Sequence, residues 1–386
     1  MSRISRSVRI RSKKPGKVLH LPLDIGGNSQ SISRGMKEKG IDSMTFVLEC
    51  GRYDYESDVR WGREGDSRFR REILRFKSAK FLFNYDTYCY NGGRTLFAPI
   101  PFSHNINYGK KISLNAYNLI LRLFQNLELK IIKIRGCVII LIYQGDDARQ
   151  GDFLIANREY SHANDVDSLY FSSKNDSLKR KQIKLLDRHC DLIYALNPDL
   201  LKVLTSKARF LPYAVTIPTF PNAHLNTRIT ERIVIGHAPT HRDAKGTKYV
   251  IKAVNSLQNL GFEIELKLIE NLTHAEAISE YQSVDIILDQ LLSGWYGAVS
   301  VESMLLSKPV ICYIADEDLQ RIPVRMATEL PIINATKNNL ESVIKQLLLM
   351  SPNERSILGE KHRKYALAWH SPQNIAEILD HDIRNL

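Results

Sequence analysis

Residues 233–247, Ile-Val-Ile-Gly-His-Ala-Pro-Thr-His-Arg-Asp-Ala-Lys-Gly-Thr, decide the fold. The apolar run Ile233–Ile235 leads into a polar turn that holds Arg242 and Lys245, and a helical pattern begins after Gly246. A strand followed by a turn and a helix is one unit of a parallel sheet, and the unpaired N–H groups at a helix N-terminus attract anions. The stretch therefore predicts an α/β fold with an anion site, suited to a diphosphate, where the strand ends. A solvated basic turn is the alternative.

Units of this kind recur along the chain. Helix-period segments separate the strand-length runs, and 386 residues suffice for two domains. We therefore expect two Rossmann-like, doubly wound parallel sheets that face a cleft. The runs expected to be strands are Val18–Leu23, Met44–Leu48, Cys137–Tyr143, Leu192–Ala195, Phe210–Tyr213, Ile233–Ile235, Ile264–Ile269, Asp285–Leu288, Pro309–Tyr313 and Pro331–Ile333. The segments expected to be helices are Ser31–Lys39, Lys174–Arg188, Lys248–Leu260, Ala275–Gln282, Val299–Leu306 and Asn339–Met350.

The boundaries follow from composition. Residues 1–16 form a basic tail, and residues 17–217 form the N-terminal domain. Residues 218–230 contain two prolines and no clear period, as a linker does. Residues 231–370 form the C-terminal domain. Ser371-Pro372 then starts a last helix over 371–386.

Charge separates the two halves. The chain carries 54 Lys+Arg and 42 Asp+Glu, a net charge of +12, of which residues 1–230 hold +16 and residues 231–386 hold −4. The basic half predicts contact with an acidic glycan or an anionic membrane surface, although a merely solubilising surface is as compatible. Seven basic residues lie around three aromatic ones, and this favours a surface contact: Arg63, Arg68, Arg70, Arg71, Arg75, Lys77 and Lys80, around Trp61, Phe69 and Phe76. No nucleic-acid reader motif is present, so nucleic acid is not expected.

Several classes of protein are excluded by composition. No run of about 18 apolar residues occurs, so no membrane span is expected. The basic N-terminus lacks the apolar core of a secretory signal, and the five scattered cysteines form no metal-binding or disulfide pattern. We expect a cytoplasmic protein with free thiols and no metal, able to lie peripherally on the inner face of the cell membrane.

A second turn with residues suited to ligand binding follows the strand Asp285–Leu288. Gly294 and Gly297 allow the backbone to approach a ligand, and Glu302 lies in the first turns of the next helix. A carboxylate at this position can accept both hydroxyls of a ribose. Its alternative role is to complement the helix dipole.

Four elements in this order resemble the C-terminal domain of GT-B glycosyltransferases of the GT4-like group (glycosyltransferase group 1). They are Lys245-Gly246, Gly294-Trp295-Tyr296-Gly297, Glu302 and Lys308-Pro309-Val310-Ile311. The resemblance covers about residues 231–313 and implies the GT-B architecture, with the last helix crossing back to the N-terminal domain. This sequence departs from the family pattern where Gly294 replaces the first glutamate of a pair, and that departure bears on the donor sugar and the stereochemistry.

The resemblance implies roles for individual residues. The catalytic group is Lys245, Arg242 and Glu302, with the two basic residues on the donor diphosphate and Glu302 on the ribose. The donor-binding residues are Gly26, Gly27, His237, Thr240, Glu276, Gln290, Gly294, Tyr296 and Gly297. The acceptor-binding residues are Asn28, Asp147 and Arg149, of which Asp147 and Arg149 could instead form a structural ion pair. Gln144 occupies the position of a family histidine, and Ile269–Leu272 is expected near the base.

The implied activity is transfer of a sugar from a nucleotide-diphosphate sugar to a hydroxyl of a glycan or lipid-linked saccharide in cell-surface polysaccharide biosynthesis. We expect a hexosyltransferase-type enzyme that retains the anomeric configuration. No cofactor or metal is expected, because Lys245, Arg242 and a helix N-terminus can neutralise the leaving diphosphate. The acidic run Asp316-Glu317-Asp318 is expected to be a solvated helix start. The open alternatives are a nucleotide-sugar 2-epimerase of the same fold and a non-enzymatic basic nucleic-acid-binding protein.

Overall fold

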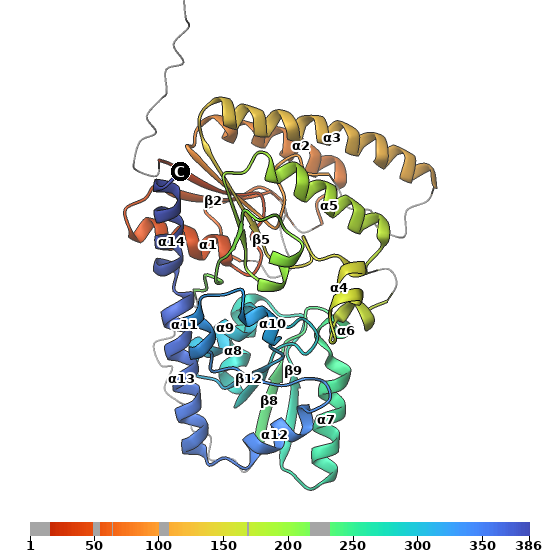
Figure 1. The fold of residues 1–386 in the computed structure, drawn as a ribbon, viewed down its shortest axis with the longest axis vertical. Helices are drawn as coiled ribbons and strands as arrows, with labels where there is room; N and C mark the ends of the chain where they lie inside the picture. The colour runs from red at the N-terminus through yellow and green to blue at the C-terminus, as the bar shows by residue number, and fades with distance from the viewer. Residues whose placement is uncertain (1–15, 49–54, 64, 100–107, 168–169, 217–231) are drawn as a thin grey trace, which may run out of the picture.

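Two parallel sheets form the framework of the molecule. The computed structural model describes residues 16–48, 55–63, 65–99, 108–167, 170–216 and 232–386 (Figure 1). One sheet has seven strands in the order β3-β2-β1-β4-β5-β6-β7, and the other has five in the order β12-β11-β10-β8-β9. Neighbouring strands run parallel throughout. The expected α/β fold with two doubly wound sheets is confirmed.

Ten of the twelve strands in the described ranges overlap the predicted apolar runs. Their bounds are β1 Val18–Leu21, β2 Ser43–Val47, β3 Val59–Arg60, β4 Thr87–Asn91, β5 Val138–Tyr143, β6 Leu192–Ala195, β7 Ala208–Phe210, β8 Ile233–His237, β9 Ile264–Leu268, β10 Ile286–Leu288, β11 Val310–Cys312 and β12 Ile333–Asn334. The sequence predicted neither the two-residue edge strand β3 nor β4, which lies at the centre of the first sheet and is buried along its length. Its Thr-Tyr-Cys-Tyr-Asn sequence has polar atoms on four of five side chains, so it forms no apolar run.

The helices include all those expected and several that were not. Their bounds are α1 Asn28–Glu38, α2 Arg68–Ser78, α3 Tyr108–Ile134, α4 Gly151–Asn157, α5 Ser173–Asp187, α6 Arg242–Lys245, α7 Thr247–Asn259, α8 His274–Ser283, α9 Ala298–Leu305, α10 Asp316–Leu319, α11 Val324–Glu329, α12 Leu340–Leu348, α13 Pro352–His370 and α14 Pro372–Arg384. Three short 3₁₀ helices are η1 Ala79–Phe83, η2 His162–Asn164 and η3 Pro198–Lys202. No helix in the described ranges is long and apolar enough to cross a membrane.

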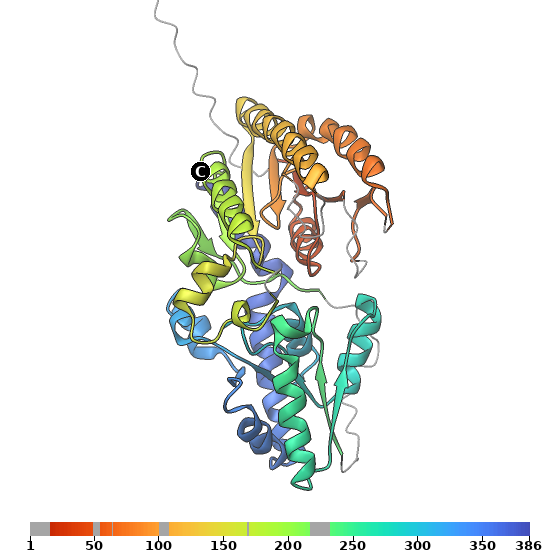
Figure 2. The same cartoon turned by 90° about the vertical axis from the view of Figure 1, so that its right-hand side faces the viewer.

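Alternating side chains give each sheet two buried faces. Along β1, Val18 packs with residues of α1 and α14, whereas Leu19 and Leu21 pack with residues of α3 and α5. Figure 2 shows these helices on opposite faces of the first sheet. A strand buried on both faces is apolar along its whole length, and this is why most of the strands could be predicted.

The last helix crosses back to the N-terminal sheet, as expected. The Ser371 hydroxyl accepts a hydrogen bond from Asn374 N (3.3 Å) at the start of α14. Ile375 and Leu379 on this helix are fully buried against the first sheet's helix α1. Gly35 of α1 permits the close approach, because a Cβ there would lie only 2.2 Å from the carbonyl oxygen of Pro372.

Buried contacts join the two sheets into one body. A single apolar cluster runs from Ile32 of α1 to Val310 of β11. The strand-like segment after β7 is tied to the end of α13 by Val215 N, which donates to His370 O (3.1 Å). Arg158, after α4, pairs with Asp318 (2.7 Å) on α10.

The predicted solvated helix start at Asp316-Glu317-Asp318 is partly wrong, since Asp318 is fully buried in its pair with Arg158. The expected linker 218–230 and all but the last residue of the expected basic tail lie outside the described residues.

Candidate functional site

A cavity of about 370 Å³ lies between the two sheets, where residues following β1, β5, β8 and β10 meet. This is the edge at which doubly wound sheets bind ligands. Seven of the residues predicted for the site line this cavity: Gly26, Arg149, Thr240, Lys245, Gln290, Gly297 and Glu302. Residues from both halves of the chain therefore face one space.

Lys245 supplies a cation to the cavity. Its ammonium group donates to Asp289 Oδ1 (3.0 Å) and to Gln290 Oε1 (2.7 Å), and its side chain is 16% exposed. A lysine ammonium has three N–H donors, so one remains for a ligand. Gly246 follows at φ +80, a left-handed conformation that allows α6 to end and α7 to start within one residue.

Asp289 holds the turn that carries Gly297. Its Oδ2 atom accepts from Gly297 N (2.8 Å) and from the Ser300 hydroxyl (2.7 Å). Burial opposes ionisation, but the charge of Lys245 and these hydrogen bonds lower the pKa of Asp289, which stays a carboxylate. The first turn of α9 is fixed against the cavity in this way, and its residues Ala298 and Val299 line the cavity.

Glu302 lies one turn further along α9 and is 3% exposed. Its Oε1 atom is 2.7 Å from His274 Nε2, and its Oε2 atom has no protein partner among the described residues. Burial raises the pKa of Glu302, while the hydrogen bond with His274 opposes that rise. A buried carboxylate with one unpaired oxygen is stabilised by any ligand that donates hydroxyl groups to it.

The glycine turn after β1 faces α9 across the cavity. Gly26 has φ +65, and a Cβ there would lie 3.5 Å from Ala298 Cβ of the other sheet's helix. Tyr55, also from the N-terminal half, has its ring 4.6 Å from the ring of His274. The turn therefore lies opposite the pair of Glu302 and His274.

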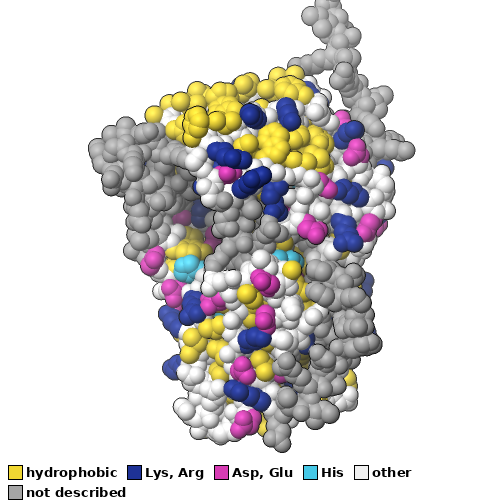
Figure 3. Space-filling model, turned by 180° about the vertical axis from the view of Figure 1, so that it is seen from behind, with side chains coloured by type: hydrophobic (Ala, Val, Ile, Leu, Met, Phe, Trp, Pro, Cys, Tyr) yellow, Lys and Arg dark blue, Asp and Glu magenta, His cyan; other side chains and the backbone are white. Residues whose placement is uncertain are grey.

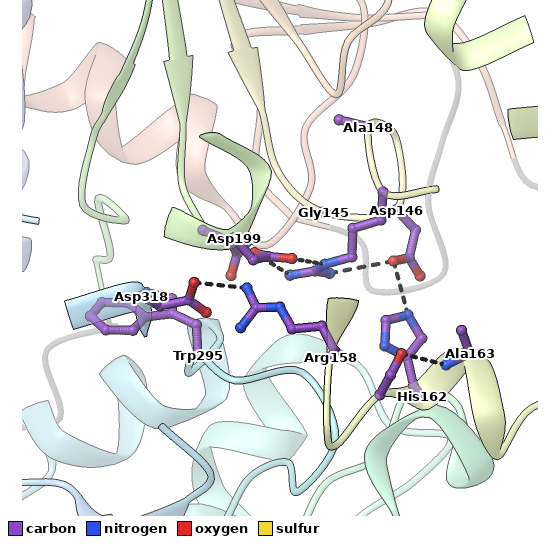
Figure 4. Close-up of polar contacts among 12 residues, drawn as sticks. Gly145, Asp146, Ala148, Arg158, His162, Ala163, Asp199, Trp295 and Asp318 are labelled. Carbon is purple, nitrogen blue, oxygen red and sulfur yellow. Dashed lines mark hydrogen bonds and ion pairs between the residues drawn. The ribbon is translucent and has the colours of Figure 1, made fainter. Parts of the chain in front are cut away.

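A charged cluster forms the wall of the cavity on the N-terminal side (Figure 4). Arg149 Nε and Nη2 donate to both oxygens of Asp199 (2.6 and 3.1 Å), and Nη1 donates to Asp146 (3.3 Å). Asp146 also lies 3.3 Å from His162 Nε2 and accepts from the Tyr170 hydroxyl. Burial opposes ionisation, but the contact with His162 and the charge of Arg149 hold the pKa of Asp146 far below its usual range.

The two adjacent aspartates of this cluster have different surroundings. Asp147 does not pair with Arg149: its carboxylate folds back to accept from the backbone N–H groups of Gln144 (3.0 Å), Gly145 (2.6 Å) and Ala148 (3.1 Å). Asp147 thus closes the turn and lines a neighbouring cavity, whereas Asp146 lines both that cavity and this one. Adjacent aspartates cannot be told apart by residue type, so only the turn geometry separates these two roles.

Two predicted donor-binding residues are buried beneath the cavity surface. His237 is fully buried, with its ring nitrogens 2.8 Å from Leu288 O and 2.9 Å from the Thr247 hydroxyl, and burial lowers its pKa to about 4. Tyr296 is also fully buried, and its hydroxyl lies 2.9 Å from His370 Nε2. Neither side chain lines the cavity, because each is used to join elements of the fold.

The other predicted residues lie around the cavity without lining it. Arg242 is exposed and pairs with Glu270 (Nε–Oε1, 3.0 Å) at the rim, and Glu276 closes a capping box with Thr273. Asn28 is fully buried and its Oδ1 accepts from Ala214 N (2.9 Å).

The remaining two glycines support backbone turns. Gly27 has φ +65 and precedes α1, and a Cβ there would lie 3.0 Å from the Tyr55 ring. Gly294 has φ +72, and a Cβ there would lie 3.1 Å from Asp318 Oδ2. Side chains cannot be added at either position without strain.

The residues expected near a base do line the cavity. Ile269, Glu270, Asn271 and Leu272 all contribute to its wall, and Asn271 adopts φ +61. Non-glycine residues in this left-handed conformation concentrate at ligand sites.

Gln144 also lines the cavity. It is 8% exposed, and neither polar atom of its side-chain amide has a hydrogen-bond partner among the described residues. A buried amide without partners costs free energy, which a ligand that bonds to it recovers.

Sequence reasoning assigned no role to several lining residues: Tyr55, Asp146, His162, Tyr170, His241 and His274. Only Asp146 had a usable signal, since it follows a predicted strand directly. The others reach the cavity through the packing of distant segments, which no local pattern encodes. In the described ranges, no group of three or more His, Cys, Asp or Glu side chains is arranged to hold a metal ion.

A second cavity of about 580 Å³ opens between α3 and α5. Its lining is mostly apolar, with cationic side chains from Arg94, Arg122, Lys179 and Lys181. Asp146 and Tyr170 line both cavities, so the second cavity lies directly beside the first.

Comparison with known proteins gives matches in structure alone. No protein-family model matches the chain, and no curated protein matches it in sequence.

Solved structures match over nearly the whole chain. Starch synthase IV from Arabidopsis thaliana, whose catalytic domain was solved with ADP and acarbose, has a TM-score of 0.55 at 12% identity and covers 97% of this chain and 100% of its own. Sucrose-phosphate synthase from Thermosynechococcus elongatus has a TM-score of 0.53 at 12% identity, covering 96% and 98%. WaaG, a glycosyltransferase involved in lipopolysaccharide biosynthesis, has a TM-score of 0.51 at 14% identity, covering 94% and 98%. The chain has the fold of the GT-B glycosyltransferases.

Proposed function

We propose that the chain is a glycosyltransferase of the GT4-like group that moves a sugar from a nucleotide-diphosphate sugar to a hydroxyl of a glycan or lipid-linked saccharide. The observation that carries the proposal is that Lys245 and Glu302 line one cavity opposite the Gly26 turn. A cation for phosphate and a carboxylate for ribose hydroxyls are the two groups that a nucleotide-sugar donor requires. The matching starch synthase IV structure was solved with ADP bound, and this supports the same chemistry.

The side chains that the C-terminal half contributes to the cavity bind the donor in this proposal. Sugar transfer leaves negative charge on the departing diphosphate, and the third N–H of Lys245 and the first turn of α9 can stabilise that charge. Glu302 Oε2 accepts from the ribose, and the Ile269–Leu272 segment lies against the base. Arg242 acts from the rim, where its charge attracts the donor without direct contact.

The side chains that the N-terminal half contributes to the cavity bind the acceptor in this proposal. Asp146 stays ionised because its pKa is far below the usual range, so it can accept a hydrogen bond from a hydroxyl but cannot act as an acid. The second cavity, which shares Asp146 and Tyr170 with the first, can hold the rest of the acceptor. Its lining is apolar over most of its surface and carries four cationic side chains against two carboxylates, Asp146 and Asp147, which favours an acceptor with a lipid part and an anionic part, such as a lipid-linked saccharide.

The stereochemistry, the metal requirement and the cellular role belong to the proposal as well. Retention of the anomeric configuration rests on the GT4-like motifs, and metal independence rests on the cation that Lys245 supplies. Product NMR that shows inversion, or loss of activity on addition of EDTA, would overturn these two parts. The proposed role is cell-surface polysaccharide biosynthesis, by analogy with WaaG, which is involved in lipopolysaccharide biosynthesis. The proposed place at the inner face of the membrane rests on the net charge of +16 in residues 1–230.

The test is nucleotide binding with a matched pair of variants. A thermal-shift screen of UDP, GDP, ADP and their sugars identifies the donor. Lys245→Met should weaken its binding at least about tenfold, the equivalent of one charged hydrogen bond of about 1.5–3 kcal/mol. The matched control is Lys248→Met. Lys248 lies three residues from Lys245, is exposed and pairs with Asp165 (2.6 Å), so its replacement should change nucleotide affinity less than about twofold. Circular dichroism checks that both variants are folded.

Two results would overturn the proposal. One is equal affinity of the Lys245→Met variant and the unchanged protein. The other is conversion of the donor to an epimer when no acceptor is present, which would identify a nucleotide-sugar 2-epimerase.

A further inference from the structure

The helices α2 and α3 expose a large apolar surface on the N-terminal half. Nine of the 19 exposed large hydrophobic side chains in the described ranges lie on these two helices: Phe69, Ile73, Phe76, Leu119, Ile120, Leu123, Phe124, Leu127 and Ile134. We call them the α2–α3 surface. Figure 3 shows apolar side chains gathered at the top of the molecule, where these helices lie, with Lys and Arg among them. Exposed apolar side chains gathered on one face of a folded protein mark an interaction site.

This surface is distinct from the core face of the same helices. On α3, Leu121, Leu129 and Ile132 are fully buried against the first sheet, whereas Leu123 is 65% exposed and Ile134 is 84% exposed. A helix that is apolar on both faces needs a partner on its outer face.

Aromatic contacts make the surface continuous across the two helices. The ring of Phe76 on α2 lies 5.1 Å from the ring of Phe124 on α3 and 5.2 Å from that of Phe97. The apolar side chains of the two helices therefore form one face, since these rings close the gap between them.

The charge around this face has one sign. Among the described side chains of α2 and α3, four Lys or Arg residues are exposed and no Asp or Glu is: Arg70, Arg71, Lys77 and Lys130. The two acidic residues of these helices face inward: Glu72 pairs with Arg75 (3.0 Å), and Glu128 accepts from the backbone N–H groups of Leu96 (3.0 Å) and Phe97 (3.1 Å). Exposed apolar side chains interleaved with cations match an anionic lipid surface, where the apolar groups enter the acyl boundary and the cations meet the headgroups.

We propose that the α2–α3 surface inserts into the interface of an anionic bilayer. Arg122 and Asn126 of α3 also line the second cavity. Insertion therefore places the mouth of that cavity at the membrane, where a lipid-linked acceptor enters. This last step rests on the proposed transferase function, whereas the insertion itself does not.

The test is flotation of the full chain with vesicles of phosphatidylcholine alone or mixed with phosphatidylglycerol, without nucleotide sugar. The chain should float with the mixed vesicles and should remain in the bottom fraction when the vesicles contain phosphatidylcholine alone. The double variant Phe69→Ser/Leu123→Ser should bind the mixed vesicles at least about tenfold more weakly, because it removes two inserting side chains. The matched control is Leu260→Ser/Val324→Ser, which removes two side chains of similar exposure (62% and 80%) from the C-terminal half and keeps full binding.

A separate measurement fixes the orientation. Tryptophan placed at Leu123 should be quenched by brominated phosphatidylcholine included in the mixed vesicles, and tryptophan placed at Leu260 should not.

Three outcomes would overturn the inference: no flotation with either vesicle, equal flotation of the Phe69→Ser/Leu123→Ser variant and the unchanged chain, or a dimer in light scattering that this variant converts to a monomer. The last outcome would assign the surface to a second copy of the chain. The nucleotide affinity of the Phe69→Ser/Leu123→Ser variant should equal that of the unchanged chain. Flotation therefore tests the membrane surface and nucleotide affinity tests the donor site, so the failure of one proposal can be told from the failure of the other.

Discussion

Replacement of Glu302 by Gln tests the ribose contact with the least disturbance of the fold. Gln has nearly the shape of Glu and keeps an atom for the hydrogen bond with His274 (2.7 Å), but it loses the charge. In the proposed complex, Glu302 Oε2 accepts from a ribose hydroxyl in a buried site, and a charged hydrogen bond of this kind contributes about 1.5–3 kcal/mol. The nucleotide affinity should therefore fall by about 10- to 150-fold.

The assay is isothermal titration calorimetry with a ribonucleoside diphosphate and with its 2′,3′-dideoxy counterpart. The dideoxy ligand lacks the hydroxyls that Glu302 is proposed to hold, so its affinity should be the same for both proteins. This comparison separates the contact from a general distortion of the cavity, as a double-mutant cycle does. The reasoning is refuted if the variant binds the ribonucleotide as tightly as the unchanged chain, or if it loses as much affinity for the dideoxy ligand.

Three further predictions follow from single side chains. Arg242→Ala should reduce nucleotide affinity by about threefold or less, measured by calorimetry, because the exposed guanidinium already pairs with Glu270; a loss of a hundredfold would place Arg242 on the diphosphate. Gln144→Leu should raise unfolding stability by about 1 kcal/mol, because it removes a buried amide without partners, and it should lower turnover; unchanged turnover would show that this amide takes no part in transfer. Burial lowers the pKa of His20 to about 4, so its contribution to stability is lost as the pH falls from the unfolded value of 6.5 towards 4. His20→Leu should accordingly remove about 2–3 kcal/mol of the stability difference between pH 7.5 and pH 4.5, measured by urea unfolding at both pH values, and an identical difference in both proteins would contradict this.

The strands were predictable where burial on both faces makes the sequence apolar. β5 is fully buried and consists of Val, Ile, Leu and Tyr, so the run 137–143 differs from it by one residue. β4 was missed because tyrosine hydroxyls supply part of its buried surface, and one of them, on Tyr90, bonds to the buried Glu128. Such a pair is visible only once the fold has brought the two segments together.

The candidate site was predictable where chemistry follows directly after a strand. Lys245, Gln290 and Glu302 come shortly after β8 and β10, and parallel strands bring those ends together. His237 and Tyr296 lie equally close in sequence, but their side chains point into the core, and residue spacing does not give that direction. Which predicted residues reach the cavity therefore depends on backbone geometry as well as on residue order.

The central claim is that Lys245 and Glu302 hold the two ends of one ribonucleoside diphosphate, and a crystal structure of the chain with the nucleotide that stabilises it most tests this directly. We expect a phosphate oxygen within hydrogen-bond distance of Lys245 Nζ and a ribose hydroxyl within hydrogen-bond distance of Glu302 Oε2. A nucleotide bound at saturating concentration away from both side chains would contradict it.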